Sequence, residues 1–176
     1  CDHSPAPYDG PSKEEVLALR HQYLSPGIIT YYRDPLMIVE GHMQYVWDET
    51  GRQYLDCFAG IVTISVGHCH PKVVERVREQ TGKLQHTTTI YLHPAVVQFA
   101  EKLAEKMPPG LTRSYFTNSG SEANEVAILS AREYTGNQAV IALRNGYHGG
   151  TSVPMSLTAH GTWKFKSNNG TNIHHT

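Results

Sequence analysis

Apolar residues recur along this chain with two different periods, and each period predicts a different kind of element. From Ser12 to about Tyr23 they fall on one side of a short helix. Between Pro35 and Cys57 they recur at even intervals, which predicts strands of an antiparallel hairpin with a turn at 48–52. The N-terminal part is therefore expected to hold one helix followed by a small antiparallel sheet.

Two further helices are expected after the hairpin. The first runs from about Val73 to Leu84, with Pro71 near its first turn. The second begins at Pro94, places apolar residues at i, i+3, i+4 and i+7 as far as Met107, and is stopped by the sequence PPG at 108–110. Both patterns are typical of helices that bury one face.

From Thr112 onward the predicted elements alternate. The strand at 115–117 precedes a helix from Ser121 to about Tyr134, and a second strand follows at 139–143. This order is typical of a parallel sheet with crossover helices, so the expected fold class is α/β. Such sheets bind ligands at the carboxyl ends of their strands, where two segments rich in small residues lie.

The first of these segments is 118–124, with the sequence NSGSEAN. Its small residues expose backbone N–H groups where a helix begins, and the helix dipole favours an anion there. A phosphorylated ligand is one interpretation. The other is a capping box, because Ser119 and Glu122 have the S-x-x-E spacing that satisfies free helix N–H groups without any ligand.

The second segment is 146–150, with the sequence GYHGG. Its glycines allow a close approach of the backbone, and the ring of Tyr147 offers a surface on which a flat aromatic cofactor could stack. The alternative is an ordinary glycine-rich turn. The two segments together favour a phosphate cradle beside an aromatic surface.

Together with earlier blocks, these two segments resemble the N-terminal half of class III pyridoxal-phosphate aminotransferases. The earlier blocks are 48–56 (DETGRQYLD), 60–61 (GI) and 67–73 (GHCHPKV). Further matches at 41–43, 60–68 and 161–164 are similar to the alanine–glyoxylate type within that family. The resemblance implies the N-terminal portion of a type I fold: a helix and small-domain hairpin at 1–66, then at 67–176 the incomplete start of a mixed, mostly parallel doubly wound sheet.

The resemblance also implies roles for individual residues. Ser119, Gly120 and Ser121 would bind the phosphate of pyridoxal 5′-phosphate, while Tyr147 stacks on its pyridine ring and His148 lies beside the ring. A sixth residue, Ile61, would face the substrate. Its alternative interpretation is a buried aliphatic side chain in an apolar strand.

The activity implied is transfer of an amino group from alanine to glyoxylate by a homodimer. In the family, the Schiff-base lysine and the aspartate that pairs with the pyridinium nitrogen lie C-terminal to Thr176, so no catalytic residue is expected in this chain. It is therefore expected to be an N-terminal fragment that is inactive alone. Two alternatives stay open: a pyridoxal-phosphate phospho-lyase acting on a phosphorylated amine, and a non-catalytic truncated isoform.

Composition narrows the classes of partner. The 176 residues carry a net charge of −1 and no cluster of basic residues, which argues against nucleic-acid binding. No apolar run approaches the roughly 18 residues of a membrane span. The three cysteines are typical of a reducing compartment, and a start at Cys1 without methionine fits a processed protein in the mitochondrion. Among eleven histidines, the best metal candidate, at 68–70 (HCH), lacks further ligands at suitable spacing, so no metal is expected.

Overall fold

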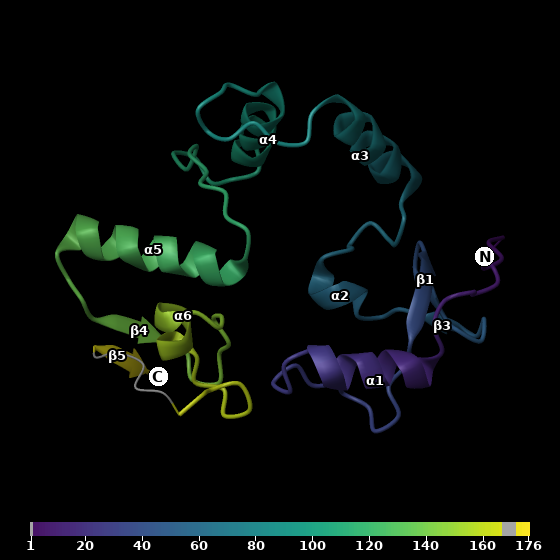
Figure 1. Ribbon diagram of the computed structural model, residues 1–176. Coiled ribbons are helices and arrows are strands. Elements are labelled where there is room, and N and C mark those ends of the chain that lie inside the picture. The colour runs from purple at the N-terminus through teal and green to yellow at the C-terminus, as the bar shows by residue number, and fades with distance from the viewer. Residues whose placement is uncertain (1, 167–171) are drawn as a thin grey trace. The chain divides into compact units, whose positions relative to one another are not determined.

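The computed structural model describes residues 2–166 and 172–176 and forms two compact units, 1–92 and 93–176 (Figure 1). The first unit holds α1 (Lys13–Tyr23), β1 (Ile38–His42), β2 (Tyr45–Asp48), β3 (Gln53–Leu55), α2 (Ala59–Val62) and α3 (Pro71–Lys83). The second holds α4 (Pro94–Ala104), α5 (Gly120–Thr135), β4 (Val140–Ala142), α6 (Ser152–Leu157) and β5 (Ile173–His175). The expected domain boundary after residue 66 stays a prediction.

The helices predicted from apolar periodicity are present. Helix α1 begins with a capping box, in which the N–H of Glu15 donates to Ser12 Oγ (3.2 Å) and the N–H of Ser12 donates to Glu15 Oε2 (2.7 Å). Helices α3 and α4 both begin at a proline, a residue whose missing N–H costs nothing in the first turn. Helix α4 ends at Ala104, three residues before the predicted end, and α5 begins one residue before its predicted start.

The predicted hairpin is a three-stranded antiparallel sheet in the order β1–β2–β3. Trp47 of β2 is 2% exposed and belongs to the buried core. The turn between β2 and β3 is organised by Asp48, whose Oδ1 accepts from the N–H and hydroxyl of Thr50 (3.0 and 2.7 Å) and from the N–H of Arg52 (3.0 Å). Its Oδ2 accepts from the hydroxyl of Tyr54 at 2.7 Å. These bonds, that of Tyr54 foremost, lower the pKa of Asp48 from 3.8 to about 2.

Asp48→Asn is expected to destabilise the full-length protein at neutral pH by about 1 to 3 kcal/mol, because an amide cannot accept from all four donors. The folded-state pKa of Asp48 lies below its unfolded value, so its contribution is present above pH 4 and lost as the pH falls toward 2. Denaturant unfolding at pH 7 and at pH 2.5 should therefore show a wild-type advantage that shrinks in acid. The control is Asp34→Asn, which removes an exposed partner of Lys13 and should change little at either pH.

The second unit confirms one predicted strand and not the other. β4 pairs in parallel with β5, with Val140 opposite Ile173. The strand predicted at 115–117 is wrong: no described residue pairs with this segment, and its backbone is irregular. A strand needs a neighbouring strand to satisfy its backbone groups, and the described residues supply none here. Tyr115 in this segment is 78% exposed.

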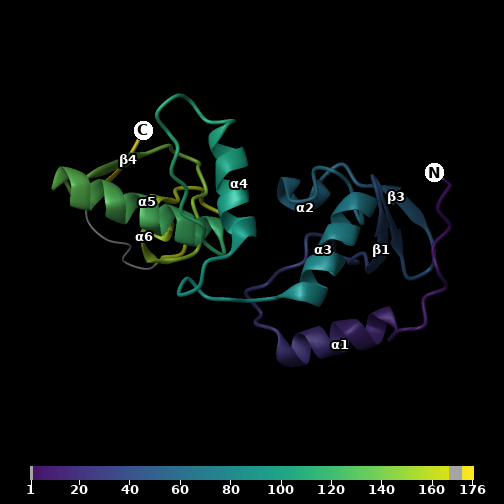
Figure 2. The same cartoon turned by 90° about the horizontal axis from the view of Figure 1, so that it is seen from above.

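Helix α5 packs against α6, as Figure 2 shows, and α6 contacts β5. Met155 and Leu157 of α6 and Ala142 of β4 form the buried apolar core of this unit, and Thr158 is fully buried after α6. The loop 146–150 lies against the first turn of α5, where the N–H of Gly150 donates to Ser121 Oγ. Among the described residues, no helix has both the length and the apolar character needed to cross a bilayer.

Candidate cofactor site

The N-terminus of α5 carries a capping arrangement close to the one predicted. Ser119 is the N-cap, and its Oγ accepts from the N–H of Glu122 at 3.1 Å. The reciprocal bond goes to a different donor, because Glu122 Oε2 accepts from the N–H of Asn118 (2.6 Å) instead of that of Ser119. The capping interpretation therefore holds for Ser119, and the carboxylate of Glu122 is turned back toward Asn118.

Capping does not use all the donors at this helix end. Within the described part of the chain, the N–H groups of Gly120 and Ser121 have no hydrogen-bond partner. A Cβ added at Gly120 would meet no atom within 4 Å, so the space beside these donors is open. Two free N–H groups, open space and the positive end of a 16-residue helix are suited to an anion.

The loop 146–150 follows β4 and presents two rings in different ways. Tyr147 is 58% exposed, and its ring meets the ring of Trp163 edge to face, with centroids 6.1 Å apart and an interplanar angle of 62°. His148 lies inward, and its backbone N–H donates to Thr158 Oγ1 (3.0 Å). Its Nε2 is buried beside Gly146 and has no hydrogen-bond partner among the described residues.

The structure brings the two predicted segments together. The N–H of Gly150 donates to Ser121 Oγ at 3.0 Å, and Asn124 Nδ2 donates to the carbonyl of His148 at 2.7 Å. Gly149 has a φ of +127°, and a Cβ there would lie 2.4 Å from Ser121 Oγ and 2.9 Å from its Cα. Because Ser121 Oγ accepts from Gly150, its own O–H proton stays available to donate to a ligand.

Two residues that hold this junction, Asn124 and Glu125, were given no role from the sequence. Asn124 holds the carbonyl of His148, and Glu125 Oε1 accepts from the N–H of Val153 at 3.1 Å. With Ser121 they occupy positions i, i+3 and i+4, so they share one face of α5. That spacing of three polar residues is the signal that could have indicated which face of the helix meets the loop.

Comparison with known proteins decides the family. The family model for class-III aminotransferases matches residues 30–175. The chain belongs to this family. A curated relative, alanine–glyoxylate aminotransferase 2 homolog 2, mitochondrial, of Arabidopsis thaliana, is 51% identical over 163 residues, which cover 93% of this chain and 34% of that protein. The chain spans about a third of the length of the curated relatives it matches.

Solved structures of aminotransferase-type enzymes share the fold of this class III chain. A phospholyase from Arthrobacter in complex with phosphoethanolamine matches with a TM-score of 0.82 and 34% identity, over 91% of this chain and 37% of that one. A taurine:2-oxoglutarate aminotransferase from Bifidobacterium kashiwanohense, in complex with PLP and glutamate, has the same TM-score at 24% identity, over 96% of this chain and 39% of that one. The predicted α/β fold and family are confirmed, and pyridoxal phosphate is the cofactor of the family.

The residues at the junction fit that cofactor. The free donors of Gly120 and Ser121 suit a phosphate dianion, and the exposed ring of Tyr147 suits a flat pyridine. Among the described residues, no three His, Cys, Asp or Glu side chains gather in a way that would hold a metal ion.

Ile61, the predicted substrate contact of this class III chain, lies in the first unit. It belongs to α2, where Ala59, Gly60, Ile61 and Val62 all have positive φ angles, of 52°, 58°, 61° and 58°. The alternative of a buried aliphatic residue in a strand is wrong, because Ile61 is 74% exposed in a left-handed turn. Its role toward a substrate stays a prediction.

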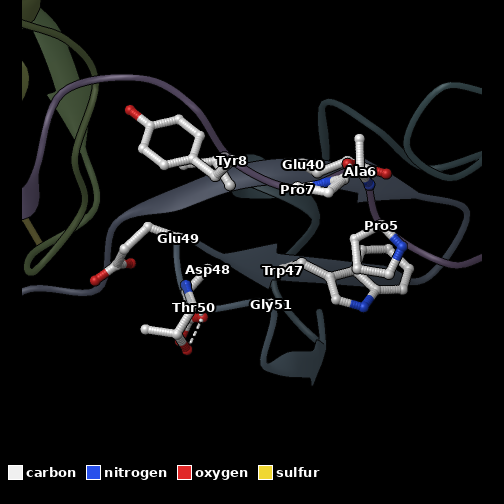
Figure 3. Close-up of a pocket in the computed structure, with 11 residues that line it drawn as sticks. Pro5, Ala6, Pro7, Tyr8, Glu40, Trp47, Asp48, Glu49, Thr50 and Gly51 are labelled. Atoms are coloured by element: carbon white, nitrogen blue, oxygen red, sulfur yellow. Dashed lines mark hydrogen bonds between the residues drawn. The ribbon is translucent and has the colours of Figure 1, made fainter.

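A pocket of about 250 Å³ lies in the first unit between the N-terminal segment and the hairpin (Figure 3). Two of the carboxylates that line it, those of Asp48 and Glu40, are already engaged. Both oxygens of Asp48 accept hydrogen bonds from its own turn, and Glu40 pairs with His3 and accepts from the N–H of Ala6 at 3.0 Å. The contacts of Glu40 hold the N-terminal segment on the sheet and those of Asp48 hold its turn, so both carboxylates have structural roles.

Proposed function

We propose that this chain supplies the phosphate- and ring-binding part of a pyridoxal-phosphate aminotransferase that moves an amino group from alanine to glyoxylate. The observation that carries the proposal is the junction of the two motif segments, closed by the bond from Gly150 N–H to Ser121 Oγ. The 51% identity to a protein named alanine–glyoxylate aminotransferase 2 homolog 2, mitochondrial, supports the choice of substrates and a mitochondrial location.

Each residue of the junction has a separate task in this proposal. Gly120 and Ser121 donate N–H groups to the phosphate, and the Ser121 hydroxyl adds a third donor, while Ser119 keeps the helix capped. Tyr147 covers one face of the ring, held at its angle by Trp163. His148 lies beside the ring. The bound cofactor supplies an electron sink for the electrons released when the substrate Cα loses a proton.

The residue that carries the cofactor covalently is proposed to lie outside these 176 residues. Lys164, the lysine next to Trp163, donates from Nζ to the carbonyls of Met155 and Ser156, both at 3.1 Å, and so caps the end of α6. Its amine is therefore committed to a structural role. The lysines elsewhere in the chain lack the family's sequence context for this task.

Exposed apolar surface supports a larger assembly. On α4, Val96 and Phe99 are 48% and 57% exposed, and the Phe99 ring meets that of Phe116 in a tilted contact with centroids 5.3 Å apart. Apolar helix faces of this kind are covered by further protein in stable folds. We propose that the remainder of a full-length enzyme and a second subunit cover them, with the small domain at 1–66 and the cofactor domain beginning at 67.

The direct test is an assay of the full-length protein with alanine, glyoxylate and pyridoxal phosphate. The proposal expects pyruvate and glycine in equal amounts. The competing function is a phospho-lyase, favoured by the 34% identity to the Arthrobacter phospholyase. Release of phosphate from phosphoethanolamine without amino transfer would replace the proposal with that function. If the full-length protein forms neither set of products, the proposed activity is wrong.

Tyr147 gives a second prediction. In the full-length enzyme Tyr147→Phe should bind pyridoxal phosphate almost normally, because stacking uses the ring and not the hydroxyl. Tyr147→Ala should weaken binding by more than roughly tenfold, since it removes both the stacked ring and its buried area. Fluorescence titration measures both. If Phe is as harmful as Ala, the hydroxyl carries the role, and if both are harmless, 146–150 is only a turn.

A further inference from the structure

Helix α6 is short and buried, and it cannot satisfy its backbone groups alone. It has six residues, of which the last four, 154–157, are buried. A helix of this length is unstable by itself, because the N–H groups of its first turn and the carbonyls of its last turn need partners from outside. Its N-cap, Thr151, makes no side-chain cap hydrogen bond. Other parts of the chain must therefore hold α6 in place.

Charged side chains from outside the helix cap both ends of α6. At its N-terminus, Glu125 Oε1 of α5 accepts from the N–H of Val153 at 3.1 Å. At its C-terminus, Lys164 Nζ donates to the carbonyls of Met155 and Ser156, both at 3.1 Å. The carboxylate lies at the positive end of the helix dipole and the ammonium group at the negative end. Both charges thus stabilise α6 in its position.

Thr158, the C-cap of α6, connects this helix to the loop 146–150. Its side chain is fully buried. Its Oγ1 donates to the carbonyl of Pro154 at 2.9 Å and accepts from the backbone N–H of His148 at 3.0 Å. A hydroxyl has one proton, so donation to Pro154 leaves the lone pairs of the oxygen for His148. The position of the His148 backbone is therefore tied to the end of α6.

The loop is fastened on both sides of Tyr147. After this residue, the N–H of His148 donates to Thr158 Oγ1, and before it, the carbonyl of Gly146 accepts from the N–H of Ala159 at 3.1 Å. Two consecutive residues at the end of α6 thus hold the two neighbours of Tyr147. The Tyr147 side chain itself is 58% exposed, so the place of its ring follows from the backbone that these two bonds fix.

We propose that Thr158 is a positioning residue for the cofactor, whose hydroxyl sets the backbone of His148 and so the place of the Tyr147 ring. Glu125 and Lys164 contribute by fixing α6, the helix that Thr158 ends. This inference rests on the proposed aminotransferase function. Thr158 acts through the loop and not by touching the cofactor, because its side chain has no exposed surface.

The test compares Thr158→Val with Thr158→Ser in the full-length enzyme. Valine keeps the branched shape and removes the hydroxyl, whereas serine keeps the hydroxyl and removes only a methyl group. Three quantities are measured. They are hydrogen exchange of the His148 amide in the cofactor-free protein, affinity for pyridoxal phosphate by fluorescence titration, and the circular dichroism of the bound cofactor.

Thr135→Val is a matched control at the far end of α5. Thr135 Oγ1 also donates to a carbonyl four residues earlier, that of Ala131, at 2.8 Å. It also accepts from a backbone N–H, that of Asn137, at 3.1 Å. Thr135 is exposed, so the same substitution removes the same pair of bonds away from the loop 146–150.

The proposal expects Thr158→Val to speed exchange of the His148 amide by about tenfold or more and to weaken cofactor affinity by about tenfold, because a buried N–H loses its acceptor. The circular dichroism of the bound cofactor should change as well, since it depends on how the surrounding groups are placed. Thr158→Ser and Thr135→Val should both stay close to the wild type in all three measurements.

Three results would overturn the proposal. Unchanged exchange of the His148 amide in Thr158→Val would show that the hydroxyl does not hold the loop. Faster exchange with unchanged cofactor affinity and dichroism would leave the bond a structural role only. Equal losses in Thr158→Ser and Thr158→Val would show that the hydroxyl is not the group responsible.

Glu125→Ala decides the question if Thr158→Val does not fold. Alanine is a good helix former, so α5 is retained while α6 loses its N-terminal partner. Faster exchange at His148 and a several-fold loss of cofactor affinity are expected. Glu125→Gln, which keeps an oxygen acceptor, should recover most of both, and Glu133→Ala at an exposed position of α5 should change neither. Unchanged values in Glu125→Ala would overturn the proposal.

A failure of the proposed function would look different. Absence of amino transfer in the wild type would contradict that function. Exchange of the His148 amide is measured without cofactor or substrate, so the comparison of Thr158→Val with Thr158→Ser would still show whether the hydroxyl holds the loop, and the titration would show whether the cofactor depends on it.

Discussion

Gly149→Ala is expected to destabilise the full-length protein by about 2 to 5 kcal/mol and to abolish tight cofactor binding. Two costs add at this position. The φ of +127° is unfavourable for any residue with a Cβ, and the new methyl group would lie 2.4 Å from Ser121 Oγ and 3.0 Å from Pro154 Cβ. Relief of that overlap separates the loop from α5 and breaks the junction. Thermal unfolding and fluorescence titration with pyridoxal phosphate measure the two effects.

The neighbouring glycine provides a matched control. At Gly150 the nearest atom to an added Cβ is the hydroxyl oxygen of Tyr147 at 4.0 Å, and the N–H that donates to Ser121 is retained in alanine. Gly150→Ala should therefore cost less than about 1 kcal/mol. Equal effects of the two substitutions would show that the loop does not need its close approach to Ser121.

Gly120→Asp is expected to weaken pyridoxal-phosphate binding by about 3 kcal/mol, roughly a hundredfold, because it places a carboxylate beside a phosphate dianion. The same substitution should leave the stability of the cofactor-free protein unchanged or slightly raised. A negative charge at the first position of a helix is favourable, and the added Cβ meets no atom within 4 Å. Loss of affinity without loss of stability separates ligand binding from capping.

Gly120→Ala is the control for size alone. Its methyl group enters open space, so its cofactor affinity should stay close to that of the wild type. Wild-type affinity in Gly120→Asp as well would mean that the helix end serves only as a cap, with Ser119 and Glu122 satisfying its donors.

Local signals in the sequence were enough to predict most helices and the hairpin. Ser12 with Glu15, Pro71 and Pro94 mark helix starts through interactions within a few residues. The hairpin register follows from the alternation of apolar residues and the Asp48 turn. The start of α5 was predicted to within one residue for the same reason.

Features that depend on distant partners were not predictable from local signals. The segment 115–117 has the composition of a strand, but strand formation depends on a neighbouring strand, and the described residues provide none. The left-handed turn at Ile61 and Val62 contradicts their preference for extended backbone. The side chains of Asp56 and His68 form a hydrogen bond across twelve positions, so their pairing depends on closure of the loop between them and not on spacing.

The candidate cofactor site was only partly predictable. Its donors and its ring were indicated by residues 119–121 and 147, which sit at an expected helix start and in an expected loop. The contact of Ser121 with Gly150 bridges 29 positions, and the bond from Asn124 to His148 bridges 24. Such pairing requires the packing of α5 on α6, which no short motif specifies.

A crystal structure of the full-length protein with pyridoxal phosphate would test the central claim most directly. We predict phosphate oxygens within hydrogen-bond distance of the backbone nitrogens of Gly120 and Ser121, and the pyridine ring against the face of Tyr147. A phosphate bound elsewhere, with these two nitrogens still unpartnered or bonded only to water, would contradict the assignment of this helix end as the cofactor site.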